Sequence, residues 1–209
     1  TGEADFFTEE QIAVSDDIIE FIEDANEQEN IKAIIFEIDS PGGSPVASEE
    51  IANAIKKTNK TTVAWIREAG ASGAYWIASA TDHIVASKMS ITGSIGVIAS
   101  YLEYAGLLNR FNLTYQRFVS GAYKDLADPF RHLSMQEREI FQAKLDKLHD
   151  YFVEEVASNR GIPKKDVQLM ATGMFYLGSE AKDIGLVDEL GSKDEAIGYI
   201  EKTLGIEAM

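Results

Sequence analysis

The chain has 209 residues, a formal net charge of −16, 45% hydrophobic residues and no cysteine. This length suffices for one domain with a sizeable core. The strong negative charge disfavours nucleic acid and anionic membrane surfaces as partners. The lack of cysteine excludes a thiol nucleophile, a disulfide framework and a thiolate metal site.

The sequence contains no apolar run near the roughly 20 residues that cross a bilayer, and no signal peptide is visible. It starts at Thr1 rather than at a methionine. We therefore expect a fragment or a processed form, with which a membrane anchor upstream of the chain is compatible.

Short apolar runs alternate with amphipathic segments in the first half of the chain. The expected elements are a helix over 8–28 with Ile12, Ile18, Ile19 and Ile22 at helical spacing, a buried strand over 33–38, a helix carrying Ile51, Ala54 and Ile55, a strand over 61–66, a helix from near Ser72, and a strand over 83–86. This repeated strand–loop–helix order predicts an α/β fold with a parallel sheet and crossover helices.

The second half reads as one strand followed by helices. We expect a glycine-punctuated turn over 91–98, a strand over 113–119, a long helix over about 135–159, and shorter helices near 164–171, 179–184 and 193–204. Ser134 and Glu137 form a capping-box pattern at the start of the long helix. With no linker, internal repeat or low-complexity run in view, the sequence predicts a single domain over 1–209.

Ser72 is the candidate nucleophile. It stands between Gly70-Ala71 and Gly73, after a predicted strand and at a predicted helix start. Small neighbours allow a sharp turn that exposes a hydroxyl, as in the nucleophile elbow, although Gly-x-Ser-Gly is not the full elbow pattern. A helix-capping or small packing serine is the alternative interpretation.

A serine hydroxyl needs a base to become a good nucleophile. None of the three histidines, His83, His132 and His149, lies in a glycine-rich loop, and we expect each to be structural, with His132 the best alternative base. Lys124 follows a predicted strand in a polar loop between Gly121 and Asp125. A lysine accepts a proton only in its neutral form, which burial favours.

The loop over 40–43, Ser-Pro-Gly-Gly, is the candidate oxyanion hole. Its proline fixes the turn, and its glycines let backbone N–H groups approach a ligand closely. Such donors can stabilise a developing oxyanion by about 3–4 kcal/mol each. The alternative is a plain turn before the next helix. A phosphate-binding loop is a weaker alternative, because the Gly-x4-Gly-Lys-[Ser/Thr] pattern is missing.

Taken together, these segments resemble the signal peptide peptidase A family of Ser–Lys serine proteases in its short single-domain form. Five motifs match in family order over residues 30–204: Ser-Pro-Gly-Gly (40–43), Ala-Ser-Gly-Ala-Tyr (71–75), Thr-Gly-Ser-Ile-Gly-Val (92–97), Ser-Gly-x-Tyr-Lys-Asp (120–125) and Gly-Leu-Val-Asp-Glu-Leu-Gly (185–191). Each motif alone is weak, but five of them in this order make the resemblance strong.

The resemblance implies a role for each site residue. Ser72 would be the acylating nucleophile, Lys124 the general base, and Ser94 the residue that orients the lysine amine. The N–H groups of Gly43 and Gly73 would form the oxyanion hole. No cofactor and no metal is implied.

The resemblance also implies a crotonase/Clp-protease-like ββα spiral. Family members form homo-oligomers in which the serine and the lysine can come from adjacent subunits. The substrates would be residual signal peptides and other hydrophobic or unfolded chains, cut on the extracytoplasmic side of a membrane. The family's N-terminal transmembrane helix and first strand precede the start of this chain, and the expected localisation is therefore a membrane-anchored protein.

Two other functions remain open at this point. A crotonase-type acyl-CoA enzyme would use paired N–H groups on the same fold, but it needs acidic residues in its loops and no Ser–Lys pair. A non-catalytic scaffold subunit could keep the fold without the chemistry, although the presence of both Ser72 and Lys124 counts against it. Fold alone does not separate these functions.

Overall fold

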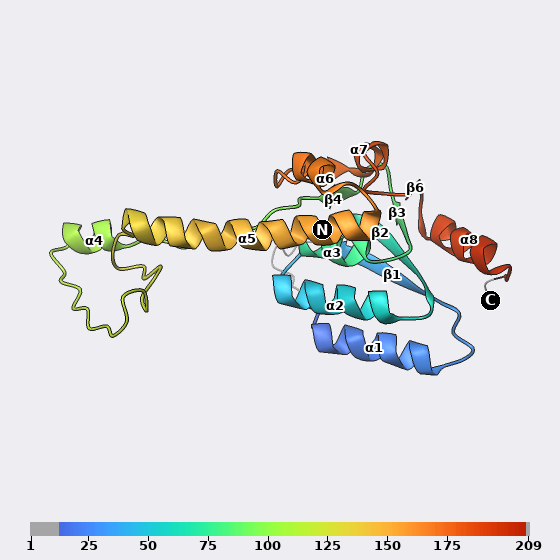
Figure 1. Ribbon diagram of the computed structural model, residues 1–209, viewed down its shortest axis with the longest axis horizontal. Coiled ribbons are helices and arrows are strands. Elements are labelled where there is room, and N and C mark those ends of the chain that lie inside the picture. The colour runs from blue at the N-terminus through green and yellow to red at the C-terminus, as the bar shows by residue number, and fades with distance from the viewer. Residues whose placement is uncertain (1–12, 208–209) are drawn as a thin grey trace, which may run out of the picture. The chain divides into compact units, whose positions relative to one another are not determined.

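The computed structural model describes residues 13–207 (Figure 1). The chain folds as two compact units. One unit consists of the described residues up to Ile95 together with those from Val153 onward, and the other is Gly96–Phe152. The expectation of a single domain over 1–209 stays a prediction.

The first unit is built on a six-stranded sheet. Its strands are β1 (Ala33–Ser40), β2 (Thr61–Ala71), β3 (His83–Ala86), β4 (Ile91–Gly93), β5 (Phe175–Leu177) and β6 (Glu189–Leu190). They follow the order β5-β4-β2-β3-β6, and β1 also pairs with β2. All pairs are parallel except β4 with β5. The α/β class and the mainly parallel sheet are confirmed.

The long strand β2 changes its partner along its length, and the sheet curls as a result. Residues 63–66 of β2 pair with β3, whereas residues 69–71 pair with β4. The pairing of β1 with β2 shifts register between Ile38 and Ser40, at the same level. The carboxyl-terminal end of β2 is thus held by β4 and separated from β3.

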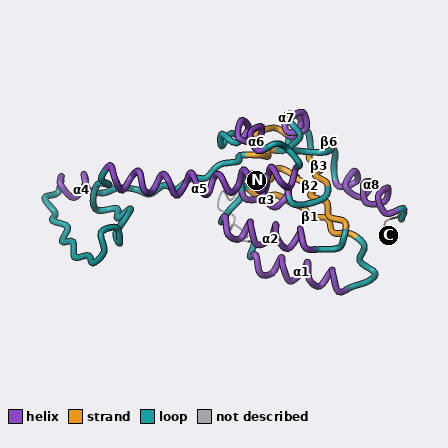
Figure 2. The backbone as a smooth tube through the Cα atoms, in the orientation of Figure 1, coloured by secondary structure: helices purple, strands orange, loops and turns teal. Residues whose placement is uncertain are grey.

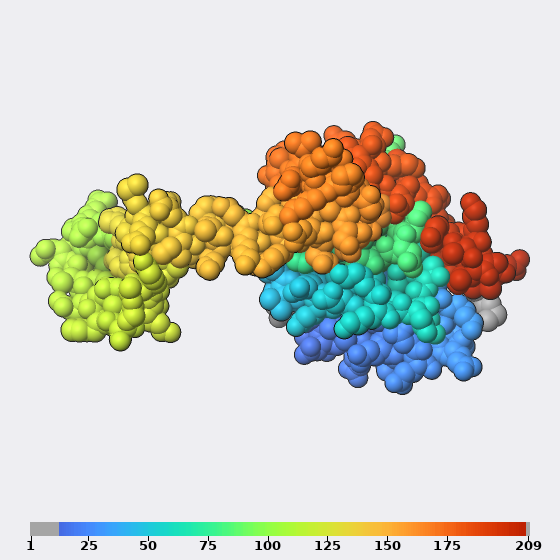
Figure 3. Space-filling model, in the orientation of Figure 1, coloured from blue at the N-terminus to red at the C-terminus, as the bar shows by residue number. Residues whose placement is uncertain are grey.

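Helices cover both faces of this sheet (Figure 2). On one face, α1 (Ser15–Glu27) and α2 (Pro45–Lys57) contribute Ile22, Ile51 and Ile55 to a cluster that Phe36 of β1 joins. Figure 3 shows these two helices, in blue and cyan, lying side by side. On the other face, α8 (Lys193–Leu204) packs Ala196 and Ile200 against Val63 and Val85. Alternate strand residues therefore feed two separate core layers.

The other helices complete the chain. They are α3 (Gly73–Ser79), α4 (Ala105–Arg110), α5 (Met135–Arg160), α6 (Lys164–Met170) and α7 (Gly178–Asp183). Ser192 and Glu195 form a capping box at the start of α8, and Gly205 ends that helix in the left-handed conformation. Within residues 13–207, no helix is long and apolar enough to cross a membrane.

The motif over residues 185–191 ties the sheet to α5. Asp188 binds the Arg160 guanidinium through both carboxylate oxygens, at 2.5 and 2.9 Å. Arg160 also donates to the Gly185 carbonyl, and the buried Tyr75 hydroxyl donates to the Leu186 carbonyl at 2.8 Å. Burial raises the pKa of Tyr75 well above its usual range. This motif is therefore structural, and it anchors the end of α5 and the first helix after Ser72.

Two predicted strands and one predicted turn differ from the structure. The strand over 33–38 is half-buried rather than buried, because β1 pairs only with β2 among the described residues. The strand over 61–66 continues to Ala71, and residues 91–93 of the expected turn form β4. The longer β2 and the additional strand β4 have one cause, because the end of β2 pairs with β4.

Two further predictions, a strand over 113–119 and a helix over 8–28, also differ from the structure. The segment over 113–119 forms no strand, and its side chains are exposed, Phe118 at 93%. No described strand lies in Gly96–Phe152 to supply a hydrogen-bonding partner, which is why a segment of high β-propensity stays a loop here. The helix expected over 8–28 begins at Ser15, and its portion before residue 13 lies outside the described residues.

Candidate active site

The candidate site begins where three parallel strands of the first unit end side by side. Ser40 at the end of β1 pairs with Gly70, and Ala71 at the end of β2 pairs with Gly93 of β4. Because the carboxyl ends of parallel strands share one edge, the loops that follow them gather there. Ser72 and Ser94 each come directly after these strand ends.

Ser72 occupies a backbone conformation that few L-residues adopt, with φ 53° and ψ −125°. Two backbone hydrogen bonds hold it there. The Ser72 N–H donates to the Gly93 carbonyl at 2.8 Å, and the Ser72 carbonyl accepts from the Trp76 N–H at 3.0 Å. Ser72 is the N-cap residue of α3, as the capping interpretation requires, but its hydroxyl makes no capping hydrogen bond. The hydroxyl of this half-buried residue is thus left available for chemistry on a strained turn.

Gly42 fits directly against this turn. Its φ is +109°, and a β-carbon built on it would lie 2.8 Å from both the Ala71 oxygen and the Gly73 nitrogen. The Gly42 N–H donates to Ser40 Oγ at 3.2 Å, which closes the loop after β1. Only glycine allows this approach, so the loop over 40–43 reaches the backbone of the serine turn.

The N–H groups of Gly43 and Gly73 lie near each other beside Ser72. A β-carbon on Gly73 would be 3.2 Å from the Gly43 nitrogen. Neither N–H donates a hydrogen bond to any residue between 13 and 207. Two unused donors next to a serine hydroxyl are the arrangement that an oxyanion hole needs. The structure therefore brings together Ser72, Gly43 and Gly73.

Ser48 is a neighbour of this arrangement that sequence reasoning missed. It is buried in the first turns of α2, and its hydroxyl donates to the Ser44 carbonyl at 3.0 Å. Its Oγ would be only 2.4 Å from a β-carbon on Gly73. Ser48 thus fills the space beside Gly73 and fixes how closely α2 approaches the serine turn. Its spacing from Ser44, four residues along a helix, was the available signal.

Ser94 sits one residue beyond the carbonyl that binds Ser72. Its φ is 49°, and its N–H donates to the Met174 carbonyl at 3.0 Å. Its hydroxyl faces the Gly173 carbonyl at 3.4 Å, a long hydrogen bond that a better acceptor could replace. Ser94 is therefore held by its backbone while its side chain is only weakly engaged.

Lys124 belongs to the other unit, Gly96–Phe152. It lies in a turn in which its N–H donates to the Gly121 carbonyl at 3.2 Å, and Gly121 takes the positive φ of 97° that the turn requires. Its side chain is exposed and forms no ion pair with any described residue. Within this unit, no described residue buries the Lys124 side chain.

Next to Lys124, a cluster of charged side chains fixes the loop. Arg131 bridges the carboxylates of Asp125 and Glu137, and Arg117 binds Asp125 from the other side. Hydrogen bonds from Arg117 and Arg131 hold the pKa of Asp125 well below its usual range. Hydrogen bonds from Arg131 and from the Ser134 backbone and hydroxyl lower the pKa of Glu137 to about 2. Both carboxylates therefore stay ionised at neutral pH.

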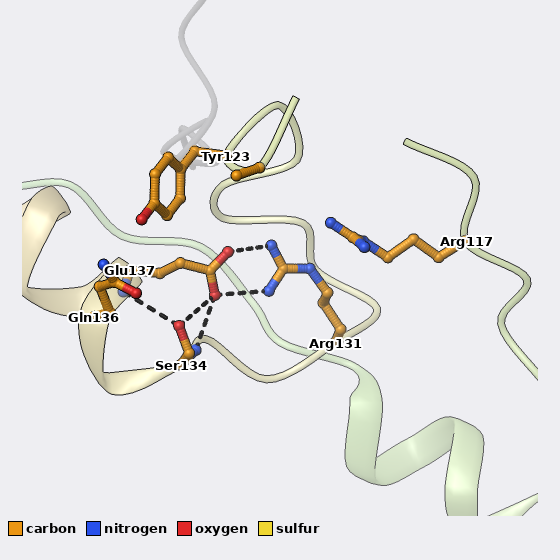
Figure 4. Close-up of a pocket in the computed structure, with 7 residues that line it drawn as sticks. Arg117, Tyr123, Arg131, Ser134, Gln136 and Glu137 are labelled. Atoms are coloured by element: carbon orange, nitrogen blue, oxygen red, sulfur yellow. Dashed lines mark hydrogen bonds and ion pairs between the residues drawn. The ribbon is translucent and has the colours of Figure 1, made fainter. Parts of the chain in front are cut away.

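A cavity of about 420 Å³ opens beside this cluster, as Figure 4 shows. In that view the Glu137 carboxylate faces the Arg131 guanidinium, and Ser134 lies against the same carboxylate. Tyr123 and Arg117 line the same cavity. The capping box predicted at Ser134 and Glu137 is confirmed, and it contributes to this ion cluster as well as to the start of α5.

Two of the three histidines, His83 and His132, occupy structural or peripheral positions. His83 of β3 stacks on Tyr199 with ring centroids 3.8 Å apart, and its Nε2 lies 3.3 Å from Glu189. His132 is 71% exposed and pairs with Glu103 at 2.5 Å within Gly96–Phe152. Residues 13–207 contain no group of three or more His, Cys, Asp or Glu side chains that could hold a metal ion.

The curled α/β sheet carries a strained serine at a strand end, and sequence comparison places the chain in one family. The model of peptidase family S49 matches residues 54–207. The chain belongs to peptidase family S49. The predicted crotonase/Clp-protease-like spiral is confirmed as a mixed α/β fold with a curled sheet, consistent with that family.

Individual relatives agree with this membership. A Methanocaldococcus jannaschii protein named "Putative protease MJ0651" is 33% identical over 90% of this chain and 61% of its own length. The "Putative signal peptide peptidase SppA" of Enterococcus faecium is 34% identical over 97% of this chain and 59% of its own. The "Serine protease SPPA, chloroplastic" of Arabidopsis thaliana is 30% identical over 92% of this chain and 29% of its own. The chain thus spans about 60% of the first two relatives.

Proposed function

We propose that this chain is a serine endopeptidase in which Ser72 is the nucleophile and Lys124 the general base. The observation that carries the proposal is the Ser72 turn, which combines a positive-φ backbone, a hydroxyl that makes no capping hydrogen bond and two adjacent N–H groups with no acceptor among residues 13–207. Membership in a peptidase family and a relative named as a serine protease support the same chemistry.

In the proposed reaction, the Ser72 hydroxyl attacks the scissile carbonyl while Lys124 takes its proton. The carbonyl oxygen becomes negatively charged and accepts hydrogen bonds from the Gly43 and Gly73 N–H groups. Lys124 then returns the proton to the leaving amine, and water hydrolyses the acyl-enzyme by the same route. Ser94, whose own hydrogen bond is long, orients the lysine amine.

Lys124 is exposed within its own unit, so its environment as a base would have to be completed by groups from outside that unit. We propose that the protein is a homo-oligomer with active sites near subunit interfaces. Lys124 then acts either on Ser72 of its own chain or on that of a neighbour.

The proposed substrates are residual signal peptides and other hydrophobic or unfolded chains, bound as an added strand beside the serine turn. A relative named as a signal peptide peptidase supports this substrate class. We propose that the catalytic domain works on the extracytoplasmic side of a membrane, with an anchor outside this sequence. Nucleic acid is not a proposed partner, given the net charge of −16.

Hydrolysis of a fluorogenic alanine- and leucine-rich peptide, without ATP or metal, tests the proposal. The wild type should be active, and Ser72→Ala and Lys124→Ala should each lose about 10⁴-fold or more in kcat. Lys144→Ala is the matched control, because Lys144 is an exposed lysine on α5 in the same unit. It should keep wild-type activity.

Any other result would indicate a different base or a different function. Hydrolysis retained in Ser72→Ala would contradict the proposal. Hydrolysis retained in Lys124→Ala would indicate another base, with His132 first in line. A folded wild type with no activity would favour the scaffold function, whereas turnover of an acyl-CoA would favour the crotonase-type enzyme.

A further inference from the structure

The loop that carries Lys124 is held in place by hydrogen bonds to its neighbour Asp125. The Asp125 side chain is only 14% exposed and accepts hydrogen bonds from two guanidinium groups, those of Arg117 and Arg131. Its backbone carbonyl accepts a third, from Arg131 Nη2 at 2.8 Å. The Lys124-Asp125 dipeptide is thus held at its carboxyl end by Arg131, through the Asp125 carbonyl, and at its amino end by Gly121, through the Lys124 N–H.

Arg131 transmits this fastening to a rigid element. The same guanidinium binds both oxygens of Glu137, at 2.6 and 2.9 Å. Glu137 lies in the first turn of α5, where Ser134 donates two hydrogen bonds to it. The planar five-donor fork of arginine suits such a double bridge, and lysine cannot reproduce it.

Arg117 makes a weaker version of the contact. It binds Asp125 alone, its side chain is 40% exposed against 20% for Arg131, and it comes from the extended loop over 113–119. Arg131 is therefore the only described residue that joins the Asp125 carboxylate and carbonyl to α5.

We infer that Arg131 is a positioning residue for the proposed peptidase reaction, which fixes the Lys124 loop through Asp125 and Glu137. This inference rests on the proposed function, because it has meaning only if Lys124 is the base. A base must stay within hydrogen-bond reach of the nucleophile, and a misplacement of about 1 Å can cost about 100-fold in rate.

The test measures how fast a fluorophosphonate labels Ser72, which reports base-assisted nucleophilicity without peptide binding. Arg131→Lys should slow labelling about 10- to 100-fold, and should lower kcat for the fluorogenic peptide with KM little changed. Asp125→Asn should give the same pattern and provides a second variant if one fails to fold. Arg67→Lys, an arginine that pairs with Glu37 on β1, is the matched control and should label at the wild-type rate.

Thermal unfolding of each variant separates positioning from folding. Labelling that falls only in proportion to the unfolded fraction would overturn the inference. Labelling at the wild-type rate in folded Arg131→Lys and Asp125→Asn would also overturn the inference. If Lys124→Ala remained unlabelled in the same experiment, the proposed function would stand. If Lys124→Ala itself labels at the wild-type rate, the proposed function fails and the inference fails with it.

Discussion

Gly42 and Ser72 touch across the ends of two neighbouring strands. A β-carbon on Gly42 would lie 2.9 Å from the Ser72 β-carbon, closer than real side chains approach. The loop after β1 and the turn after β2 therefore depend on each other, although 30 residues separate them.

The first prediction follows from this contact. Gly42→Ala should lower the free energy of unfolding by about 1–3 kcal/mol, because it adds both a positive-φ strain and a backbone clash. Its peptidase activity should fall by more than the loss of folded protein explains, because the substitution displaces the Gly43 N–H. Chemical denaturation and peptide hydrolysis measure the two effects. Gly198→Ala in α8 is the control, since its β-carbon meets open space, and it should be stabilised by about 0.5–1 kcal/mol.

A second prediction concerns Gly73 and Ser48 as a pair. Gly73→Ala places a methyl group 2.4 Å from Ser48 Oγ and should destabilise the protein by about 1–3 kcal/mol. Ser48→Ala removes that oxygen and leaves the Ser48 β-carbon in ordinary contact at 3.4 Å. The double variant should therefore be more stable than the sum of the two single effects predicts. Strict additivity in a double-mutant cycle would show that the close contact is relieved in another way.

The ion pair between Arg160 and Asp188 gives a third prediction. The Arg160 side chain is 8% exposed, so Arg160→Leu leaves a carboxylate that has lost its main partner and should cost about 3 kcal/mol. Lys164→Ala at the exposed Glu154 pair should cost less than about 1 kcal/mol. The midpoints of chemical denaturation of the two variants measure these losses of stability. Equal small losses would mean that Asp188 finds compensation from the solvent.

A fourth prediction is a pH dependence of stability. The pKa of Glu137 is lowered from 4.5 to about 2, so the folded protein favours its ionised form. The resulting stabilisation is present above about pH 4.5 and is lost as the pH falls through about 2. Glu137→Gln should unfold at a lower temperature than the wild type at pH 7, and the two curves should converge toward pH 2. Glu139→Gln, on the exposed side of α5, serves as the control.

Sequence alone predicted the elements that carry their own signals. The strand over 83–86 and the helix over 193–204 have the expected bounds, because a short apolar run and a capped amphipathic stretch specify them locally. The extension of β2 to Ala71 was missed because Glu68, Ala69 and Gly70 carry no strand propensity. Their strand conformation comes from pairing with β4, which is a tertiary effect.

The candidate site was predicted in the same uneven way. Ser72 was singled out because small residues at a strand end indicate a tight turn, and Gly43 and Gly73 were added by the family resemblance. The contacts of Arg131 could not be predicted from the sequence, because an arginine in a polar loop is expected to be solvated unless its carboxylate partners are known. The strand expected over 113–119 failed for a related reason, since β-propensity predicts pairing only where a partner strand exists.

The hydrogen bond from Ser72 to Gly93 makes the serine turn readable by amide hydrogen exchange. The Ser72 amide proton is tied to a strand carbonyl and should exchange slowly, whereas that of the exposed Gly43 has no acceptor among the described residues and should exchange fast. A boronate or phosphonate that seats an oxygen between the Gly43 and Gly73 N–H groups would slow amide exchange at both glycines and leave that of Ser72 unchanged. The two glycine amides would then report occupancy of the site in a protein that cleaves nothing during the measurement.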